Sequence, residues 1–378
     1  MKSVFAYSFI IGAAQGLLLV LLLFRKKENI IANRLLAVTM FLFSIDLILE
    51  AAAVTEYIKD YPILIGPMQT FPYLYGPAIF LYVFFITRGI KKFDYNILLH
   101  YLPFVLVQVY GLFFFYFEST EYQLSLVYVE QELPWHVLLI SYFTPIYGGF
   151  YIALTVYEAY KYNKELKNNF SSIDKHNLSW VKFLAIGSIL LWFTAIFMTI
   201  LQLIYGKEIR SELVSYLAIS VFIYAMAYKG LAQPEVKIIE ENSEHEENLT
   251  ERKAGSYSKS GLSEEEANKY LKNLLLVMDE QKPFKNDKLN LTELSKIIGI
   301  SNHNLSEILN RKIEQNFYDF INSYRVEEVK KLISEDRNST YSILAHGFEA
   351  GFTSKSAFYS AFKKITGKTP AQFRRENL

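Results

Sequence analysis

Two carboxylates inside an apolar stretch are the first residues whose chemistry needs an explanation. Asp46 and Glu50 lie four positions apart in the apolar run Leu35–Val54. Residues four apart share one face of a helix, and carboxylates within a membrane are costly and normally face a polar interior. One interpretation is a ligand or proton site that senses a signal. The alternatives are polar packing, or a position of Glu50 near the outer membrane interface.

Other reactive side chains do not form a recognisable catalytic set. The chain has no cysteine, which excludes disulfides, thiolate zinc sites and cysteine nucleophiles. His100 and His136 are single histidines without a partner at metal-ligand spacing, so we expect interfacial side chains. The sequence contains no GxSxG, no HExxH and no glycine-rich phosphate loop. It therefore predicts no enzyme activity, no metal site and no cofactor.

The segment Leu291–Leu309 has the sequence pattern of a helix-turn-helix. A short apolar-periodic helix ends at Gly299, a residue that readily adopts the left-handed conformation of a helix end. After a tight turn, Ser301 can cap a second helix whose Leu305 and Leu309 face inward. Such a second helix presents its outer N-terminal face to the major groove of DNA.

The same pattern occurs again in Ile343–Lys364. Gly351 takes the place of the first glycine with one extra turn residue, and Phe358 and Phe362 replace the two inward leucines. The amphipathic segment Phe317–Ile333 lies between the two patterns and spans about 26 Å as a helix. Major-groove sites on one face of DNA lie about 34 Å apart, so a helix of this length can hold two reader helices on adjacent turns.

Basic side chains collect toward the C-terminal end. From Ser339 onward the sequence contains six basic residues and two acidic residues, Glu349 and Glu376. The cations are Lys355, Lys363, Lys364, Lys368, Arg374 and Arg375. Such cations contact phosphates and supply affinity without sequence discrimination.

Residues from about Ser263 to Arg375 resemble the DNA-binding domain of the AraC/XylS family of transcription regulators. The signature GF-x-S-x-S-x-F-x-x-x-FKK-x-x-G-x-TP-x-x-FR runs from Gly351 to Arg374. The resemblance implies two helix-turn-helix units joined by a helix, which read adjacent major grooves of double-stranded DNA.

The resemblance also implies which side chains face DNA. On the two reader helices they are Asn302, His303, Ser306, Glu307, Lys355, Ser356, Ser360, Lys363 and Lys364. The last two lysines are expected near phosphate. Glu307 departs from the polar or basic residue of many family members, although a carboxylate can accept a hydrogen bond from cytosine N4. Gly347, inside a helix, is expected to cost about 1 kcal/mol relative to alanine.

The elements that carry these residues fall into two halves. The first half contains seven apolar runs of the length that crosses a bilayer, about 20 residues each. They are Phe5–Phe24, Leu35–Val54, Ile65–Ile86, Leu98–Phe117, Trp135–Tyr157, Val181–Ile204 and Leu213–Tyr228. Three prolines in the third run predict a late start or a kink.

Lysines and arginines in the short loops predict the orientation. They concentrate in the loops after the first, third and fifth runs, and the alternate loops contain few. The rule places cation-rich loops inside, the N-terminus outside and the C-terminal half in the cytoplasm. We expect a multi-pass protein of the bacterial inner membrane, with the lipid bilayer as a partner.

The polar segment Ala232–Leu262 has no periodic apolar face and is predicted to be a flexible acidic linker. The expected organisation is all-α, with a seven-helix membrane domain in residues 1–231 and an AraC-type domain in residues 263–378. A disordered linker would not transmit a rigid movement. Signalling would then use docking and release of the DNA-binding domain, or a change in oligomerisation such as homodimer formation.

These patterns favour a one-component regulator whose membrane half senses a small molecule or a membrane protein. The first alternative keeps the same DNA-binding domain and makes the membrane half a passive anchor or a platform for protein interactions. A membrane enzyme or transporter with a regulatory tail is disfavoured, because catalytic motifs are missing from the sequence.

Overall fold

The computed structural model describes residues 2–27, 29–90, 94–128, 134–173, 179–205, 211–231, 262–336 and 340–377. Within these ranges every named element is helical, and the one pairing of extended backbone is an isolated bridge between Phe170 and Asn290. The prediction of an all-helical protein is therefore confirmed. The predicted linker lies outside the described residues, except for Leu262.

The chain divides into two compact units. The first comprises Met1–Tyr160 and Leu178–Ile238, and the second comprises Lys161–Asn177 and Ile239–Leu378. The division falls within one helix, α7, which runs from Trp135 to Asn169.

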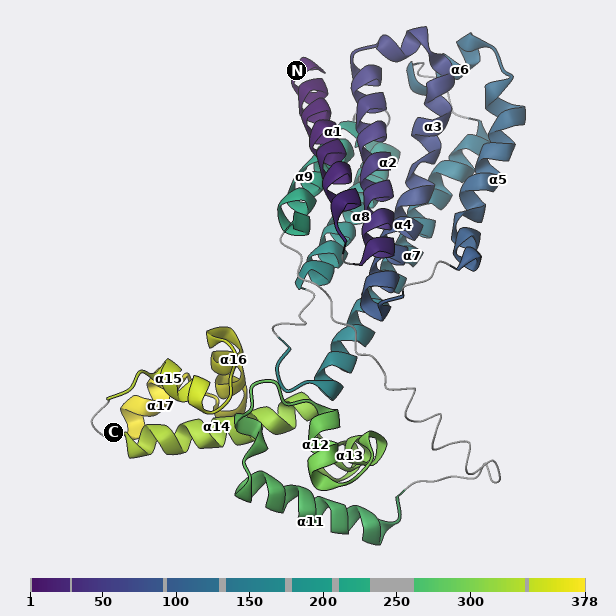
Figure 1. The fold of residues 1–378 in the computed structure, drawn as a ribbon. Helices are drawn as coiled ribbons and strands as arrows, with labels where there is room; N and C mark the ends of the chain where they lie inside the picture. Colours follow the sequence, from purple (N-terminus) through teal and green to yellow (C-terminus); the bar gives the residue numbers. More distant parts are fainter. Residues whose placement is uncertain are drawn as a thin grey trace, which may run out of the picture. The chain divides into compact units, whose positions relative to one another are not determined.

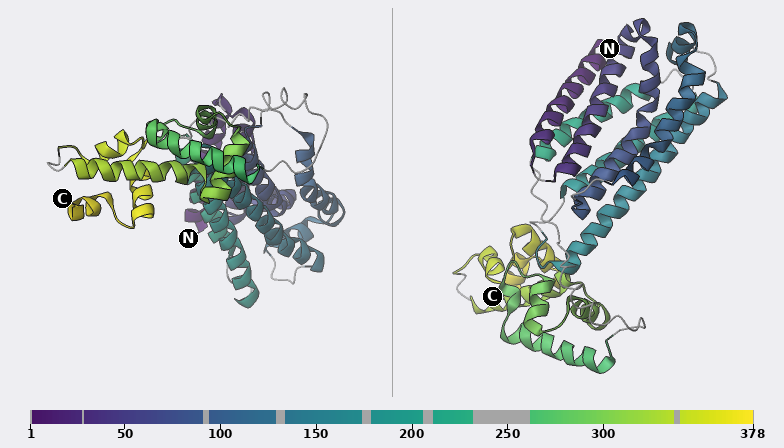
Figure 2. Two further views of the ribbon diagram at one scale, coloured as in Figure 1. Left: turned by 90° about the horizontal axis from the view of Figure 1, so that it is seen from below. Right: turned by 45° about the vertical axis from the view of Figure 1, so that its right-hand side comes forward.

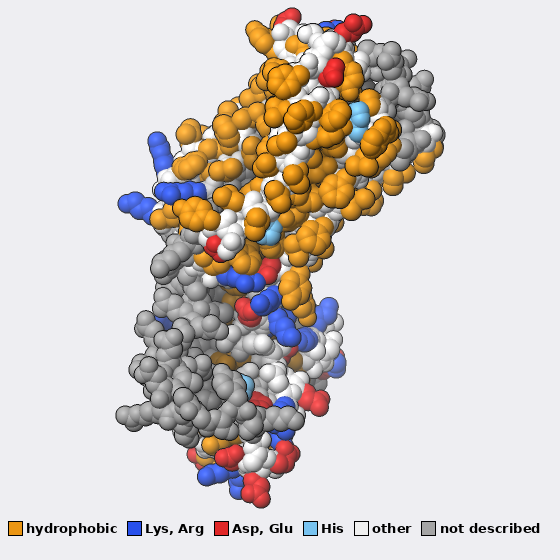
Figure 3. Space-filling view, turned by 90° about the vertical axis from the view of Figure 1, so that its right-hand side faces the viewer, with side chains coloured by type: hydrophobic (Ala, Val, Ile, Leu, Met, Phe, Trp, Pro, Cys, Tyr) orange, Lys and Arg blue, Asp and Glu red, His pale blue; other side chains and the backbone are white. Residues whose placement is uncertain are grey.

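The first unit is built from long apolar helices. They are α1 (Lys2–Arg25), α2 (Ile30–Val54), α3 (Ile65–Thr70), α4 (Pro72–Arg88), α5 (Leu102–Gly111), α6 (Thr120–Tyr128), α8 (Ser179–Tyr205), α9 (Ser211–Leu231) and most of α7. Helix α1 packs along α2 and α9, and α8 packs along α9 (Figure 1). Hydrophobic side chains cover most of the face of this unit drawn in Figure 3.

Five segments of the described chain are long and apolar enough to cross a membrane. They are Ser3–Arg25, Ile30–Val54, Pro62–Arg88, Tyr95–Tyr116 and Trp135–Asn169. Shorter apolar stretches, Lys182–Met198 and Val214–Ile223, lie in α8 and α9. The five candidate spans support a membrane half, and the count of seven crossings stays a prediction.

Two of the apolar runs differ from simple continuous helices. In the third run α3 ends at Thr70 and α4 begins at Pro72, since a proline fits the first turn of a helix better than its interior. Helix α7 continues to Asn169, well past Tyr157, where the apolar run ends. The thickness of the bilayer limits the length of an apolar run, but it does not limit the length of a helix. Helix α7 continues beyond the apolar run because good helix formers such as Lys161 and Glu165 follow it.

The second unit contains α11 (Glu264–Glu280), α12 (Leu291–Ile298), α13 (Asn302–Ile308), α14 (Phe317–Glu335), α15 (Ile343–Glu349), α16 (Lys355–Thr366) and α17 (Pro370–Asn377). The local signals of the sequence are confirmed. Ser263 and Glu266 form a capping box at the start of α11, and Gly299 ends α12 with φ +77°. Ser301 and Ser354 accept hydrogen bonds from backbone amides as the N-caps of α13 and α16.

Helix α14 contributes to two separate hydrophobic cores. Figure 2 shows this long yellow-green helix between the green helices that precede it and the yellow helices that follow it. Its N-terminal residues, such as Phe317 and Phe320, pack with α11, α12 and α13. Its C-terminal residues, such as Val326 and Val329, pack with α15, α16 and α17. One rigid helix therefore joins a first helix pair, α12 and α13, to a second helix pair, α15 and α16.

Candidate DNA-binding surface

Helix α13 presents the first group of residues expected to face DNA. Leu305 and Ile308 are buried in the core, which turns the opposite face of α13 outward. On that face the His303 side chain is 74% exposed, with Nε2 3.9 Å from a carboxylate oxygen of Glu307. Of the four candidates on this helix, Asn302 and His303 are exposed, whereas Ser306 and Glu307 are half-buried.

Asn302 has a structural role in the same helix pair. Its Oδ1 accepts a hydrogen bond from Ser295 Oγ at 2.6 Å, and its Nδ2 donates to Thr292 Oγ1 at 2.9 Å. Both partners lie on α12, so the amide connects the two helices of the pair. A contact from Asn302 to a base would compete with these bonds.

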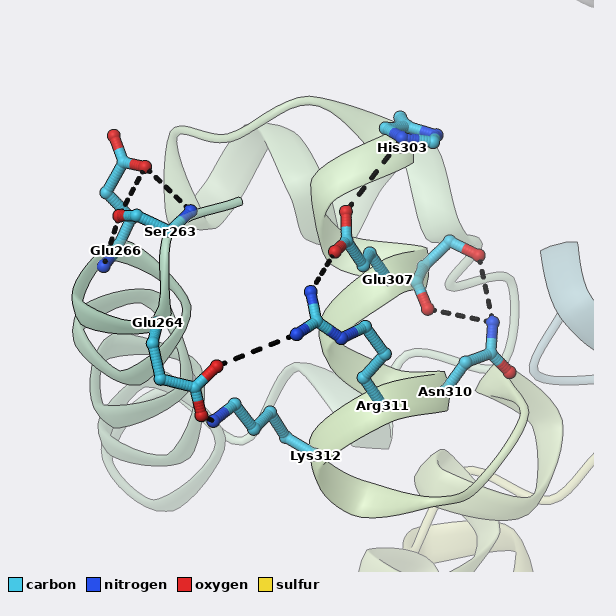
Figure 4. A network of polar contacts seen from close by, with 9 residues as sticks. Ser263, Glu264, Glu266, His303, Glu307, Asn310, Arg311 and Lys312 are labelled. Carbon is cyan, nitrogen blue, oxygen red and sulfur yellow. Dashed lines mark hydrogen bonds and ion pairs between the residues drawn. The ribbon is translucent and has the colours of Figure 1, made fainter. Parts of the chain in front are cut away.

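An ion-pair network surrounds Glu307 (Figure 4). The Glu307 carboxylate is 16% exposed and pairs with Arg311, one helical turn further along the chain. Arg311 also lies 3.6 Å from Glu264, which in turn pairs with Lys312. This pairing neutralises the unusual acid and leaves it less available to cytosine. The spacing of four between Glu307 and Arg311 is a sequence signal that predicts such a pair.

Helix α16 presents the second group of expected residues. The side chains of Lys355, Ser356, Ser360, Lys363 and Lys364 are all exposed, while Phe358 and Phe362 are buried. Lys355 Nζ lies 5.5 Å from the centre of the Tyr359 ring, a cation–π distance. Lys364 Nζ is 2.8 Å from Asp319 Oδ1 on α14, which leaves Lys363 better placed than Lys364 for phosphate.

The partly buried Asp336 stabilises the second helix pair on the side away from the expected DNA-facing side chains. Its carboxylate accepts hydrogen bonds from the backbone amides of Tyr341 and Thr340, at 3.0 and 2.8 Å, and lies within 3.3 Å of His346 and Arg374. The backbone bonds, that of Tyr341 first, lower the pKa of Asp336 to about 2. Arg374 is therefore a structural cation rather than a free phosphate ligand.

Arg325 is the functional residue that sequence reasoning missed. It lies on α14 between the residues of the two cores and is only 1% exposed. Its guanidinium donates to the carbonyl oxygens of Phe284 at 2.8 Å and Asn286 at 2.9 Å. It also donates to the carbonyl and the hydroxyl of Ser171, both at 3.0 Å. Burial lowers the pKa of Arg325 to about 10, so it stays charged at neutral pH.

Comparison with known proteins identifies this part of the chain. Residues 294–376, which begin within α12 and extend into α17, match a family described as a helix-turn-helix domain. The C-terminal part therefore carries a helix-turn-helix domain.

Similar proteins include uncharacterized HTH-type transcriptional regulators of Staphylococcus aureus strains COL and MSSA476. Both are 30% identical over 89 residues. The matched stretch covers 24% of this chain and only 12% of the length of each relative. A Listeria innocua protein of unknown function is 24% identical, with a TM-score of 0.25, over 29% of this chain and 97% of its own.

Outside the helix-turn-helix domain, the structure places both candidate sensing carboxylates in the interior of the first unit. Asp46 is fully buried and Glu50 nearly so. The Tyr75 hydroxyl, on α4, donates a hydrogen bond to Asp46 Oδ2, and the two rings of Phe43 and Tyr75 lie 4.3 Å apart. Asp46 Oδ1 has no hydrogen-bond partner among the described residues. A buried carboxylate with a spare oxygen has capacity for a proton or a donor group.

Proposed function

We propose that this protein is a membrane-bound one-component transcription regulator of the bacterial inner membrane, which binds double-stranded DNA through two helix-turn-helix units. The observation that carries the proposal is the shared helix α14, which joins both helix pairs while the outer faces of α13 and α16 stay exposed. Its 19 residues span about 28 Å, compatible with major grooves about 34 Å apart. The names of the relatives support a regulatory role rather than an enzymatic one.

DNA binding is tested on the full-length protein in detergent with labelled duplexes. We expect an affinity that falls steeply with salt, because lysines replace counterions on phosphates. Lys355→Ala should weaken binding to every sequence and reduce the salt dependence by about one phosphate contact. Ser356→Ala and His303→Ala should instead change the preferred bases, each at a cost of about 1–3 kcal/mol.

Sites selected from random DNA report these preferences. The positions affected by Ser356→Ala and His303→Ala should lie about 10 base pairs apart, because α14 separates the two reader helices. Wild-type protein that shows no salt-dependent binding would refute the proposed function. If both variants affected the same base positions, the binding of two adjacent major grooves would be refuted, but DNA binding itself would not.

The membrane half is proposed to cross the bilayer seven times, with the N-terminus outside. The five candidate spans and the two shorter apolar stretches support this topology, together with the cation-rich loops. Reporter proteins fused after Lys27, Lys92 and Lys175 should be active in the cytoplasm. A reporter fused within Glu118–Pro134 should be active outside, and cytoplasmic activity at that site would contradict the topology.

Sensing is proposed for Asp46 and Glu50, because two buried carboxylates in an apolar helix cost free energy that a passive anchor does not require. The double variant Asp46→Asn with Glu50→Gln keeps the shape and removes the charge. It should change the set of regulated transcripts while protein level and membrane insertion stay unchanged. Identical transcript profiles for variant and wild type across growth conditions would favour a passive anchor.

A further inference from the structure

The three residues after α7, Phe170–Ser172, make specific contacts inside the second unit, and we call them the α7 tail. Phe170 forms an antiparallel bridge with Asn290, the N-cap of α12. The Ser171 amide donates to the Leu289 carbonyl at 3.2 Å, and the Ser171 hydroxyl donates to the same oxygen at 2.5 Å. The tail thus pairs like a short strand with the segment that leads into the first helix pair.

The α7 tail also completes the environment of the buried arginine on α14. Ser171 is itself buried, and its carbonyl and hydroxyl both accept hydrogen bonds from Arg325. The same guanidinium holds the carbonyls of Phe284 and Asn286, which precede the first helix pair. Without the tail, Arg325 would lose two of its five hydrogen bonds in a place from which water is largely excluded.

The next residue of the tail reaches the second helix pair. The hydroxyl oxygens of Ser172 and Thr353 are 2.5 Å apart. Thr353 directly precedes Ser354, the N-cap of reader helix α16. The α7 tail therefore contacts the entry to α12, the middle of α14 and the entry to α16, and none of the expected DNA-facing side chains is among these contacts.

We propose that the α7 tail is a built-in ligand of the helix-turn-helix domain, which keeps both reader helices at the spacing needed for simultaneous contact with DNA. The inference rests on the proposed DNA-binding function. Simultaneous engagement of two linked sites strengthens binding only when their geometry permits it. Because the tail is the direct continuation of α7, a change in that helix alters DNA affinity without passing through residues 232–262.

Docking is tested in the full-length protein in membranes with the double variant Ser172→Cys and Thr353→Cys. The chain has no cysteine of its own, so any disulfide within one chain must join these two positions. The two hydroxyl oxygens are 2.5 Å apart, and the sulfur atoms that replace them are about 2.05 Å apart in a disulfide. The two positions are therefore close enough for a disulfide to form. Mild oxidation should protect both thiols from maleimide, whereas each single variant should stay reactive. Thiols that remain reactive in the double variant would overturn the docked arrangement.

Coupling is tested with Ser171→Ala, which removes the hydroxyl bonds to Leu289 and Arg325. The probes are a duplex selected from random DNA by the wild-type protein and a shorter duplex with one half of that site. We expect Ser171→Ala to weaken binding to the full site by roughly three- to tenfold and to leave the half-site unchanged. Ser334→Ala is the matched control, because the exposed Ser334 hydroxyl donates to the Lys330 carbonyl of its own helix and contacts neither Leu289 nor Arg325.

The two tests separate this inference from the proposed function. Wild-type protein without DNA affinity would refute the regulator, and disulfide formation would still decide whether the tail docks. If Ser171→Ala bound the full site as tightly as the wild-type protein, or more tightly, the proposed effect of the α7 tail on DNA affinity would be overturned. The oxidised cysteine pair should retain wild-type affinity for the full site, and its loss would also overturn the proposal.

Discussion

Arg325→Met should lower the free energy of unfolding of the C-terminal unit by about 3–5 kcal/mol. The guanidinium is buried and donates to four oxygens of Phe284, Asn286 and Ser171 at 2.8–3.0 Å. Methionine fills a similar volume but offers no donor, so these oxygens remain buried without that partner. Each unsatisfied buried acceptor costs about 1–3 kcal/mol, and partial relaxation toward water keeps the total below the full sum.

This loss is measured by unfolding the full-length protein in urea and monitoring the C-terminal unit through its amide hydrogen exchange. Arg311→Met is the matched control, because Arg311 is half exposed and forms surface ion pairs. Such solvent-exposed pairs contribute little to the free energy of unfolding. A change for Arg325→Met no larger than that of the control would show that Arg325 does not stabilise the contact between the two helix pairs.

Gly351→Ala should lower the free energy of unfolding of the C-terminal unit by about 3 kcal/mol or more, for two separate reasons. Gly351 has φ +99°, a conformation that alanine adopts only with strain. A Cβ atom at this position would also lie 2.5 Å from the Phe284 carbonyl oxygen and 2.8 Å from that of Lys285. Both obstacles are backbone atoms, so the turn before α16 would have to move away from the segment Phe284–Lys285, which precedes α12.

Gly367→Ala separates the two effects in the same unfolding measurement. Gly367 has φ +74°, and an added Cβ atom there meets nothing within 4 Å. We expect a loss of about 1 kcal/mol from the conformational cost alone. The excess loss at Gly351 then measures the close approach of the turn before α16 to Phe284 and Lys285. Equal losses at the two glycines would mean that this approach has no energetic role.

Local chemistry explains why much of the C-terminal domain could be predicted. Ser263, Ser301 and Ser354 each cap a helix through their own side chains, and Gly299 ends one through its own backbone freedom. These interactions span four residues or fewer, so they can be read from the chain directly. The buried leucines and phenylalanines of α13 and α16 likewise follow from helical periodicity.

The role of Gly347 could not be predicted from local sequence. Helix propensity alone predicts a loss relative to alanine. In the fold, a Cβ atom at Gly347 would lie 2.8 Å from the ring of Phe358, so the glycine permits α15 to approach α16. The partner is eleven positions away, and only the packed structure shows that the two meet.

The sequence by itself determined the helical class, the apolar first half and the resemblance to a DNA-binding domain, because each depends on composition or on neighbours along one helix. The tertiary structure alone decided the bonds from Asn302 to α12, the burial of Arg325 and the contacts of Ser171. These depend on groups brought together from distant positions, up to 154 residues apart for Ser171 and Arg325. No periodic pattern encodes such a distance, since it results from how complete helices pack.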